Sequence, residues 1–546
     1  QAHVPVPTGH REDRGGARAG TCGPRHRRLR LLGQPVPAFL TETTQVGTGA
    51  DLSNDSGVLA ISHRPNVIII FTDEQQARSL PIAQSRHGNE TVQTPDLTRF
   101  AQDCAQFAQV FTPCPWCVPS RVAMMTGRYP RVNGSRTNEH LMRPSERHMP
   151  GVFADAGYSV GLVGKNHCFR DEQLAEFDHV WLANHLGPVD ASYDPRVQAA
   201  KDWVRESGPG PKCWGAATNP HPHEALGTAQ TVSHGIDFLD EVGDDPFFLW
   251  LSIPDPHTPL QAAEPWASMY DPDEVPLPPL IDGEMESKPT CQQIDYRALC
   301  GNTVTEPIMR RAIAMYYGMV SAIDHEVGRF LGELEDRGLA EETIVVYTSD
   351  HGDYVGEHRM IRKSKALYDC LTQIPLMVRW PGELDGGARH DELLSNVDLM
   401  PTLLDLCGLE TPAGVQGRSF APLLRGGPYE PRDALLMEAG STQPRVALED
   451  AGPFPEGPLT PDFSPRMKLG GRGLIRGVRT KTHKLVRYPG GDEGELYDLT
   501  ADPWELENLW GRAEQEGIEG DLTARLLDLH IETKDPLPVD AKGTPD

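Results

Sequence analysis

The chain contains 546 residues with a formal net charge of −27, and hydrophobic residues make up 38% of it. This length and composition fit a globular protein with a large core, and the acidic balance argues against a broad surface that binds nucleic acid. A membrane span needs roughly 18 consecutive apolar residues, and the sequence contains no such run. We therefore expect no nucleic-acid partner and no membrane span.

The first 63 residues differ in character from the rest of the chain. Residues 1–33 carry seven arginines against two acidic residues, without hydrophobic periodicity. Such a basic leader can serve as a nucleic-acid or membrane arm, but it is more typical of a disordered tail, and we predict a disordered leader over 1–63. No apolar core of a secretory signal is present, so we expect a cytoplasmic protein. Export through an upstream signal stays open, because the first methionine of the sequence is Met124.

From residue 64 onward, apolar strand patterns alternate with amphipathic helix patterns. Continuous apolar runs are typical of strands buried on both faces of a parallel sheet. They occur at 65–73, 158–164, 246–253, 343–349 and 374–380. Helical patterns occur at 94–104, 228–242, 306–338 and 397–408. This alternation predicts the α/β fold class, with a large, mostly parallel sheet flanked by helices.

We divide the chain after the leader into two domains. Residues 64–425 form the predicted catalytic α/β domain, in which the Pro- and Gly-rich stretches 183–225 and 256–300 are predicted to be long loops over one edge of the sheet. Residues 426–546 form a smaller α+β domain. Polar and apolar residues alternate there around a PGG turn, which predicts a short antiparallel sheet, and a helix is expected near 519–531.

Polar side chains follow four of the apolar runs, at the points where the predicted strands end. The carboxyl ends of parallel strands meet at one edge of a sheet, where ligands bind. We therefore expect these side chains to share one site: Asp73, Glu74, Lys165, His167, His257, Asp350 and His351.

The acidic members of this group suit a divalent metal ion. Asp73, Glu74 and Asp350 supply the oxygen ligands that a hard cation prefers, and His351 adds a nitrogen. Carboxylates this close together would repel one another without a cation between them. The sequence thus predicts a site for a divalent metal ion and leaves its identity open among Ca²⁺, Mn²⁺ and Mg²⁺, because histidine is less typical of calcium sites.

Cys114 and Cys117 form a C-x-x-C pair in the segment PCPWCVPSRVAMMTGR, residues 113–128. Such a pair can be a redox dithiol or half of a zinc site, but no second close pair of cysteines completes a zinc site. Pro119 instead suits the first turn of a helix that ends at Gly127, with Cys117 near its N-terminus and Arg121 one turn further on. An anion is favoured at such a position.

The ten cysteines show no repeating framework, so we expect mostly free thiols. Cys291 and Cys300 could pair if the protein is exported.

The segment 117–128, CVPSRVAMMTGR, resembles the C-x-P-S-R-x4-T-G signature of type I sulfatases, the formylglycine-dependent branch of the alkaline-phosphatase-like superfamily. The resemblance extends over about 64–510. It is carried by PNVIIIFTDE (65–74), TPDLTRFA (94–101), GKNH (164–167), DPHTPL (255–260), TSDHGDYVGEH (348–358) and ELYDLTADPWELENL (495–509).

The resemblance implies a role for each matching residue. Cys117 would be oxidised to formylglycine by a formylglycine-generating partner and would share the metal with Asp73, Glu74, Asp350 and His351. Arg121 and Lys165 would hold the aldehyde hydrate, and His167 would help it return to the aldehyde. His257 and Lys363 would bind the sulfate oxygens and assist the leaving group. Asn138 would touch the substrate.

Two of these ligands depart from the commonest family pattern. That pattern has Asp-Asp after the first strand, and it often has Asn after the aspartate that corresponds to Asp350. Glu74 and His351 are therefore the less secure ligands, and Gln75 is an alternative to Glu74.

The resemblance implies hydrolysis of a sulfate monoester. One hydroxyl of the hydrated aldehyde attacks sulfur and expels the alcohol, and the remaining hydroxyl then loses its proton as sulfate is released.

Two other functions stay open. A phosphonate monoester or phosphodiester hydrolase of the same superfamily resembles sulfatases at the cysteine motif and metal site, but that branch tends to carry Tyr and Thr where this chain has Lys165 and His167. A non-catalytic binding protein with an unconverted cysteine is the third reading.

The alcohol part of the substrate is also open, with aryl, choline-like and carbohydrate sulfates as candidates, and so is the oligomeric state. A polyanionic sugar would need basic residues from a segment such as 128–143, which contains Arg128, Arg131, Arg136 and Arg143. A solvated face explains these arginines equally well.

Overall fold

The computed structural model describes residues 64–80, 90–190, 194–209, 212–460 and 471–535. The chain divides into the units Gln1–Ala60 and Ile61–Asp546, and every described residue belongs to the second unit. The predicted leader 1–63 therefore lies outside the described residues. No helix in the described part combines the length and the apolar character needed to cross a membrane.

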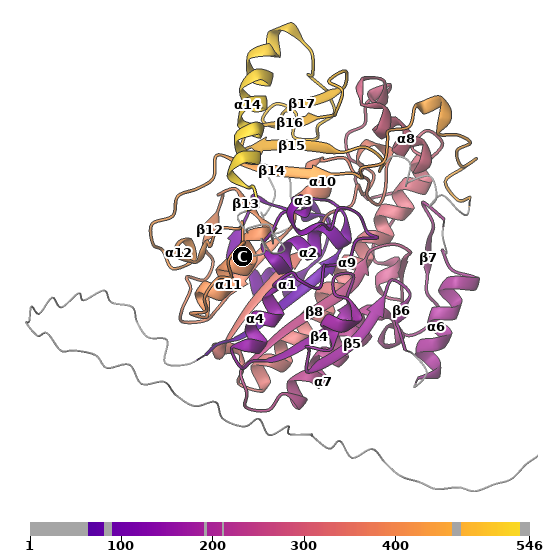
Figure 1. The fold of residues 1–546 in the computed structure, drawn as a ribbon. Helices are drawn as coiled ribbons and strands as arrows, with labels where there is room; N and C mark the ends of the chain where they lie inside the picture. The colour runs from indigo at the N-terminus through magenta and orange to yellow at the C-terminus, as the bar shows by residue number, and fades with distance from the viewer. Residues whose placement is uncertain (1–63, 81–89, 191–193, 210–211, 461–470, 536–546) are drawn as a thin grey trace, which may run out of the picture. The chain divides into compact units, whose positions relative to one another are not determined.

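The central layer is a nine-stranded sheet with the strand order β12-β2-β11-β10-β1-β8-β4-β5-β6 (Figure 1). Its strands are β1 Asn66–Asp73, β2 Ala105–Phe107, β4 Ser159–Lys165, β5 His179–Asn184, β6 Gly187–Pro188, β8 Phe247–Pro256, β10 Thr343–Ser349, β11 Leu376–Arg379 and β12 Arg389–His390. β1 is parallel to β8 and β10, and β4 is parallel to β8 and β5. The predicted parallel core of the sheet is confirmed.

One predicted strand runs in the other direction. The apolar run 374–380 forms β11, which is antiparallel to β10, with Val378 opposite Val346. β2 is antiparallel to β11, and β6 is antiparallel to β5. A continuous apolar run shows that both faces of a strand are buried, but it does not encode the direction of the strand.

Helices cover both faces of the sheet (Figure 1). The helices are α1 Pro95–Gln102, α2 Cys117–Thr126, α3 Pro130–Asn133, α4 Met149–Asp155, α5 Asp171–Leu174, α6 Pro195–Glu206, α7 Gly227–Glu241, α8 Thr290–Ala298, α9 Glu306–Asp336, α10 Asp369–Thr372, α11 Leu399–Leu406, α12 Ala421–Leu424 and α14 Glu516–Glu532. The patterns at 94–104, 228–242, 306–338 and 397–408 correspond to α1, α7, α9 and α11.

The side chains of β1 alternate between the two faces. Ile68 and Ile70 join an apolar cluster that includes α7 and α9, whereas Val67, Ile69 and Phe71 join a second cluster with α2 and α11. All five side chains are fully buried. Since both faces are covered, the carboxyl ends of the strands remain as the place for a ligand site.

The two stretches predicted as long loops contain regular structure. Helix α6 and strand β7 (Ala216–Thr218) lie within 183–225, and strand β9 (Leu260–Ala262) and helix α8 lie within 256–300. Prolines misled the prediction, because proline marks the first turn of a helix as well as a loop. Pro195 is the first residue of α6, and Pro289 directly precedes α8.

Asp295 in α8 gives a prediction about pH. Its side chain is fully buried, and burial raises its pKa to about 7, against the opposing effects of Lys365 and Ser364. Because the folded-state pKa lies above the unfolded value, ionisation penalises the folded state progressively as the pH rises from about 4 to about 7. We expect Asp295→Asn to be more stable than the wild type by about 2–4 kcal/mol at pH 8, and by much less at pH 5. Urea unfolding at both pH values measures this; a gap that does not widen with pH would contradict it.

The C-terminal part forms the predicted antiparallel sheet, in the order β14-β15-β16-β17 (Figure 1). Its strands are β14 Ala434–Ala439, β15 Ile475–Thr480, β16 His483–Arg487 and β17 Gly494–Asp498. Leu522 and Leu526 of α14 pack against this sheet, in a cluster that also contains Ala123 of α2. The backbone N–H of Glu438 in β14 donates a hydrogen bond to the carbonyl of Pro113 at 2.7 Å. The C-terminal sheet therefore packs directly on the segment that contains the cysteine motif.

Candidate active site

Helix α2 places Cys117 in its first turn. The helix begins at Cys117, directly after Trp116, and Gly127 ends it in the left-handed conformation with a φ of 62°. The predicted helix is thus confirmed. The first N–H groups of a helix have no partner within it, so this position favours negative charge.

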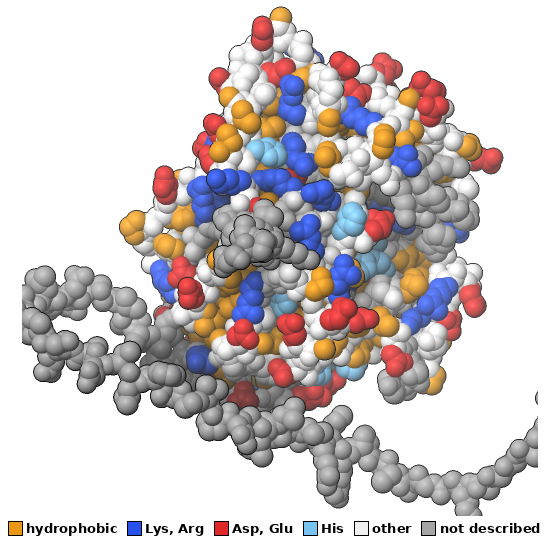
Figure 2. Space-filling model, viewed as in Figure 1, with side chains coloured by type: hydrophobic (Ala, Val, Ile, Leu, Met, Phe, Trp, Pro, Cys, Tyr) orange, Lys and Arg blue, Asp and Glu red, His pale blue; other side chains and the backbone are white. Residues whose placement is uncertain are grey.

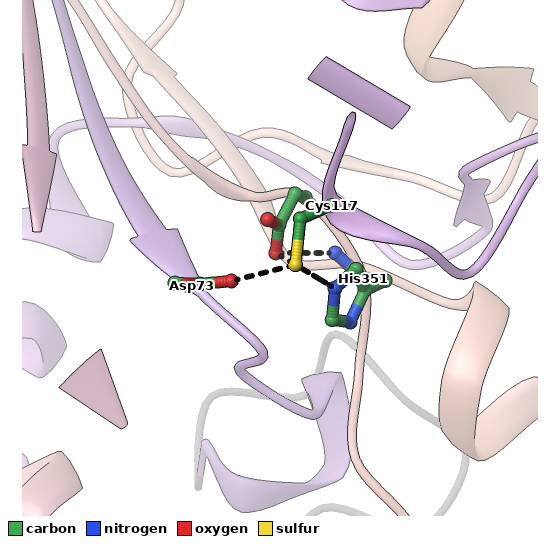
Figure 3. Close-up of side chains that lie close together, drawn as sticks. Asp73, Cys117 and His351 are labelled. Atoms are coloured by element: carbon green, nitrogen blue, oxygen red, sulfur yellow. Dashed lines mark hydrogen bonds and ion pairs between the residues drawn. The ribbon is translucent and has the colours of Figure 1, made fainter. Parts of the chain in front are cut away.

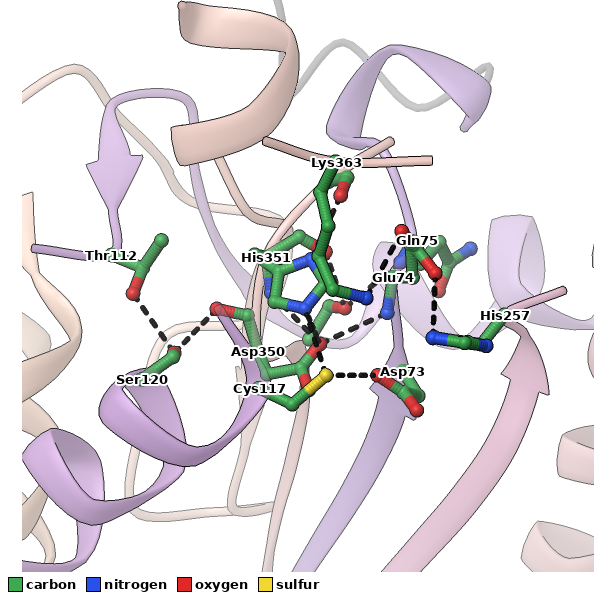
Figure 4. A network of polar contacts seen from close by, with 12 residues as sticks. Asp73, Glu74, Gln75, Thr112, Cys117, Ser120, His257, Asp350, His351 and Lys363 are labelled. Carbon is green, nitrogen blue, oxygen red and sulfur yellow. Dashed lines mark hydrogen bonds and ion pairs between the residues drawn. The ribbon is translucent and has the colours of Figure 1, made fainter. Parts of the chain in front are cut away.

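Ser120 connects the start of α2 to the end of β10. Its hydroxyl donates a hydrogen bond to the backbone carbonyl of Asp350 (Figure 4). It accepts hydrogen bonds from Thr112 Oγ1 at 2.8 Å and from Asn396 Nδ2 at 2.9 Å. The serine of the motif therefore holds Cys117 beside the aspartate that follows β10.

Cys117 faces side chains at the ends of three strands, two of which, Asp73 and His351, are shown in Figure 3. Its sulfur lies 3.3 Å from His351 Nε2, 3.6 Å from Asp73 Oδ1 and 3.6 Å from Lys165 Nζ. Cys114, in contrast, lies in an apolar cluster with Phe111 and Leu367. All nine described cysteines are free thiols. Cys114 and Cys117 therefore form no disulfide with each other, and neither do Cys291 and Cys300.

Arg121 is fully buried and joins α2 to the ends of three strands. Its Nε donates to Asp350 Oδ2 at 2.9 Å, and its Nη1 donates to the carbonyl of Lys165 at 3.0 Å and to Ser252 Oγ at 2.8 Å. Its guanidinium carbon lies 4.9 Å from the centre of the Phe71 ring. Asp350 follows β10, Lys165 ends β4 and Ser252 belongs to β8, so Arg121 fixes the helix against the carboxyl edge of the sheet.

Lys165 and His167 lie at the end of β4. The ammonium of Lys165 contacts the Asp73 carboxylate directly. His167 has a φ of 43°, and its Nδ1 is buried without a hydrogen-bond partner in the described structure. Burial, together with the charges of Lys165 and Arg121, lowers the pKa of His167 to about 2. Its imidazole is therefore neutral at neutral pH.

His185 belongs to the site, although the sequence analysis missed it. It follows β5, the parallel neighbour of β4, and its ring stacks on that of His257 with centroids 3.6 Å apart and planes 13° apart. His185 Nδ1 lies 3.5 Å from Asp73 Oδ2. Burial lowers the pKa of both histidines well below the ordinary value, so the rings stack as neutral groups. In the sequence, His185 directly follows the strand HVWLAN. This strand is only half-buried and has no continuous apolar run, so the sequence pattern did not identify it as a strand.

Glu74 lies beside this group, next to His257 and Lys363 (Figure 4). Its two oxygens lie 3.1 Å from His257 Nε2 and 3.1 Å from Lys363 Nζ. These contacts lack hydrogen-bond angles, so both buried oxygens of Glu74 have no hydrogen bond within the described chain. Its φ of 67° is left-handed, and Tyr316 OH donates to its carbonyl at 2.8 Å. Backbone strain of this kind persists mainly at functional sites.

Gln75, the alternative to Glu74, has its side-chain oxygen engaged elsewhere. That oxygen accepts hydrogen bonds from Thr72 Oγ1 at 2.8 Å and Tyr347 OH at 2.6 Å. The geometry therefore favours Glu74 over Gln75 as an additional oxygen ligand.

The donor set fits a divalent cation. Asp73, Cys117, Asp350 and His351 are buried, and their ligand atoms all lie within 4.8 Å of one another. His351 Nδ1 lies 2.8 Å from the carbonyl of Gly352 and donates to it, which leaves the lone pair of Nε2 facing the Cys117 sulfur. Burial alone would raise the pKa of Asp350, but His351 and nearby cations lower it below its usual range, so this carboxylate is ionised. Glu74 lies next to these four residues rather than among them.

Asn138 lies between the active site and solvent. It is exposed, and its Oδ1 accepts a hydrogen bond from the backbone N–H of Val118 at 3.1 Å, in the first turn of α2. It lines a cavity together with Trp116 and Lys363. Its contact with substrate stays a prediction.

The structure thus brings the residues predicted for the site together at one edge of the sheet: Asp73, Glu74, Cys117, Arg121, Lys165, His167, His257, Asp350, His351 and Lys363. Their individual roles remain predictions.

The comparison with known families agrees with this geometry. The family model described as Sulfatase matches residues 65–409, which is more than half of the chain. A second model, described as N-sulphoglucosamine sulphohydrolase, C-terminal, matches residues 473–532. The chain belongs to the sulfatase family and is a sulfuric ester hydrolase.

Individual relatives cover most of the chain. An arylsulfatase from Clostridium perfringens is 28% identical over 475 residues, which is 82% of this chain and 90% of the relative. An N-acetylglucosamine-6-O-sulfatase from Bacteroides thetaiotaomicron is 25% identical and covers 88% of each chain. The solved phosphonate monoester hydrolase of Agrobacterium radiobacter is similar with a TM-score of 0.71 at 22% identity, over 86% of this chain and 96% of that one. This last likeness shows the fold alone.

Proposed function

We propose that this chain hydrolyses a sulfate monoester to an alcohol and inorganic sulfate, with a formylglycine derived from Cys117 as the nucleophile. The supporting observation is the position of the Cys117 sulfur, which faces His351, Asp73 and Lys165 at the carboxyl edge of the sheet. Burial raises the pKa of the Cys117 thiol to about 11, so the unmodified side chain is protonated and weakly nucleophilic at neutral pH. A formylglycine-generating enzyme is therefore the proposed maturation partner.

The proposed metal ligands are Asp73, Asp350, His351 and the modified Cys117, with Glu74 next to them. Ca²⁺ is the first candidate, and Mn²⁺ or Mg²⁺ are alternatives. When bound, such an ion neutralises sulfate oxygens and increases the acidity of a hydroxyl beside it. The hydrated formylglycine supplies that hydroxyl and a second one, whose deprotonation allows sulfate to leave.

The chain's own side chains hold the substrate and move the protons. Arg121 and Lys165 border the position of Cys117 and would hold the hydroxyls of the hydrate there. Burial lowers the pKa of Lys165 well below its ordinary value, so Arg121 is the permanent cation of the pair. His167, whose Nδ1 has no hydrogen-bond partner in the described structure, is the side chain proposed to accept the proton of the second hydroxyl. Burial would lower the pKa of Lys363, but Cys117 and Glu74 raise it above its ordinary value, so Lys363 remains charged and can bind sulfate oxygens with His257. The charged Lys363 can then donate a proton to the leaving alcohol, because the neutral imidazole of His257 already donates its Nδ1 proton to the carbonyl of Thr258.

The proposal extends to the substrate class and to the location. The N-acetylglucosamine-6-O-sulfatase acts on a sulfated sugar by its name, which supports a carbohydrate leaving group for this chain. Nine free thiols in the described residues are consistent with a reducing compartment, which supports the cytoplasm.

The rival activity is phosphonate monoester hydrolysis. With the purified, metal-loaded enzyme produced together with its maturation partner, we expect kcat/KM for 4-nitrophenyl sulfate to exceed that for an aryl phosphonate monoester by about tenfold or more. The reason is that Lys165 and His167 border the reacting group in place of the Tyr and Thr of the phosphonate branch. Release of 4-nitrophenol measures both rates.

Mass spectrometry of the same preparation tests the nucleophile. Conversion replaces the Cys117 sulfur with oxygen and removes two hydrogens, so the peptide mass changes by that amount. A clear phosphonate preference would favour the rival function. An active enzyme whose Cys117 peptide is wholly unmodified would contradict the formylglycine proposal.

A further inference from the structure

A cavity of about 970 Å³ opens beside the active site. Its walls come from four parts of the chain: Trp116 before α2, the segment 134–143, Lys363–Ser364, and residues 441–443 with 471–472 of the C-terminal part. Ligand pockets in proteins measure about 300–1,000 Å³, so this cavity has room for more than a sulfate group.

The cavity is continuous with the reacting centre through three side chains. Trp116 directly precedes Cys117, and Asn138 accepts a hydrogen bond from the first turn of α2. Lys363 reaches inward to Glu74 at 3.1 Å. A substrate whose sulfate lies at Cys117 would therefore place its alcohol part in this cavity.

The cavity is cationic although the chain is strongly acidic. Its described lining contains Arg136, Arg143, Lys363 and Arg472 against the carboxylate of Glu139, whereas the whole chain has a net charge of −27. Lys and Arg side chains gather in the middle of the face shown in Figure 2. Positive charge in a concave site raises the local concentration of anionic ligands.

The arginines of the segment 128–143 have different partners. Arg128 is paired with Glu146 and Asp535, and Arg131 with Glu438, so these two support the fold. Arg136, Arg143 and Arg472, which line the cavity, form no ion pair with any described carboxylate. Arg136 Nε is in addition buried without a hydrogen bond in the described structure. Arg136 Nη2 does donate to the carbonyl of Arg131, at 3.3 Å. Among the described residues, therefore, no carboxylate neutralises these three charges of the cavity.

Gly134 positions one of these arginines. It has a φ of 87°, and a Cβ atom there would lie 2.3 Å from Arg143 Nη2. The guanidinium of Arg143 thus packs directly on the backbone of Gly134, and a larger residue at position 134 would displace it. Arg143 lines the cavity wall and has no ion pair with a described carboxylate.

The other walls suit a sugar ring. Trp116 Nε1 donates to the carbonyl of Ser364 at 2.9 Å, which fixes the indole in the wall. Hydroxyl and amide side chains of Ser441, Thr442 and Gln443 form the C-terminal wall. An aromatic side chain together with hydroxyl and amide side chains in one cavity wall suits a carbohydrate, whereas a cationic alcohol such as choline would be repelled by the arginines.

We propose that this cavity binds a second anionic group, a sulfate or a carboxylate, on a carbohydrate leaving group, through Arg136, Arg143 and Arg472. The inference rests on the proposed sulfatase function and specifies its substrate class as multiply anionic glycans. One bidentate, charge-assisted contact between an arginine and the anion contributes about 1.5–3 kcal/mol, which corresponds to a tenfold or larger gain in kcat/KM.

The test compares substrates that differ by one anion. Amino-sugar monosulfates with the ester at O3, O4 or O6 are compared with the same esters carrying an N-sulfate, and with the same esters linked to a uronic acid. For the wild type we expect kcat/KM to rise about tenfold or more with the added anion. The N-sulfate and uronate arms distinguish sulfate from carboxylate recognition.

The variants Arg143→Gln and Arg472→Gln are expected to reduce this gain about tenfold, because they raise KM for the substrates that carry the added anion. Arg147→Gln is the matched control, because Arg147 lies in the same region but pairs with Asp155 and does not line the cavity. An active wild type with equal kcat/KM for both members of each pair, or a gain that survives both substitutions, overturns the inference while the sulfatase function stands. If neither these esters nor 4-nitrophenyl sulfate are hydrolysed, the proposed function fails and the inference fails with it.

Discussion

Cys117→Ala is expected to lower kcat for sulfate ester hydrolysis by about 10⁴-fold or more while the fold stays intact. Alanine cannot be oxidised to an aldehyde, and no other described side chain could take the place of Cys117 in the group with Asp73, Asp350 and His351. The helix itself does not depend on the thiol, because Ser120 and Arg121 attach α2 to the end of β10. The lost contacts of a small buried side chain reduce stability by only about 1–2 kcal/mol. Steady-state sulfate release and thermal unfolding measure the two effects.

Cys114→Ala is the matched control for this variant. Cys114 lies three residues away in the apolar cluster with Phe111, outside the metal-ligand group. We expect it to lose a similar amount of stability and to keep kcat within about a factor of two, since it touches no reacting group. Substantial hydrolysis by Cys117→Ala, or equal losses of activity in both variants, would show that the thiol at 117 is not the source of the nucleophile.

The parallel core of the sheet could be predicted from sequence because burial on both faces leaves a distinct pattern. The runs that became β1, β4, β8 and β10 are apolar without interruption, and the polar residues that follow them had to meet at one edge. The site residues of those strands were found for the same reason. β11 lies in the predicted place but in the opposite direction, since burial does not specify direction.

Other features depend on contacts between distant residues, which a single sequence does not encode. His185 enters the site only because β5 pairs with β4 and brings its ring onto His257. The four arginines of 128–143 are indistinguishable in sequence, yet Glu438 and Asp535 engage Arg131 and Arg128 from more than 300 residues away. The partners of a charged side chain, rather than its own position, decide whether it supports the fold or faces a ligand.

Arg121→Ala is expected to destabilise the folded protein by about 3–5 kcal/mol and to abolish turnover. The guanidinium is fully buried, donates to Asp350 at 2.9 Å and lies 3.7 Å from Asp73. Its removal leaves both carboxylates buried without this cation, and it also removes the bonds to the Lys165 carbonyl and Ser252 that join α2 to β4 and β8. Urea unfolding in the presence of a chelator measures the loss, and added Ca²⁺ should restore part of it, because the two carboxylates then gain a replacement cation.

Arg432→Ala provides the comparison that separates stability from catalysis. The Arg432 side chain is only 7% exposed and bonds to both oxygens of Asp398, far from the reacting group in sequence and outside the metal-ligand residues. We expect it to lose a similar 3–5 kcal/mol but to keep kcat within a few-fold at temperatures where it remains folded. If Arg121→Ala unfolds at the same urea concentration as the wild type, Arg121 does not balance the buried carboxylates of the site. If its folded form releases sulfate at the rate of Arg432→Ala, Arg121 does not assist the reaction, because that role requires its charge at the end of β10.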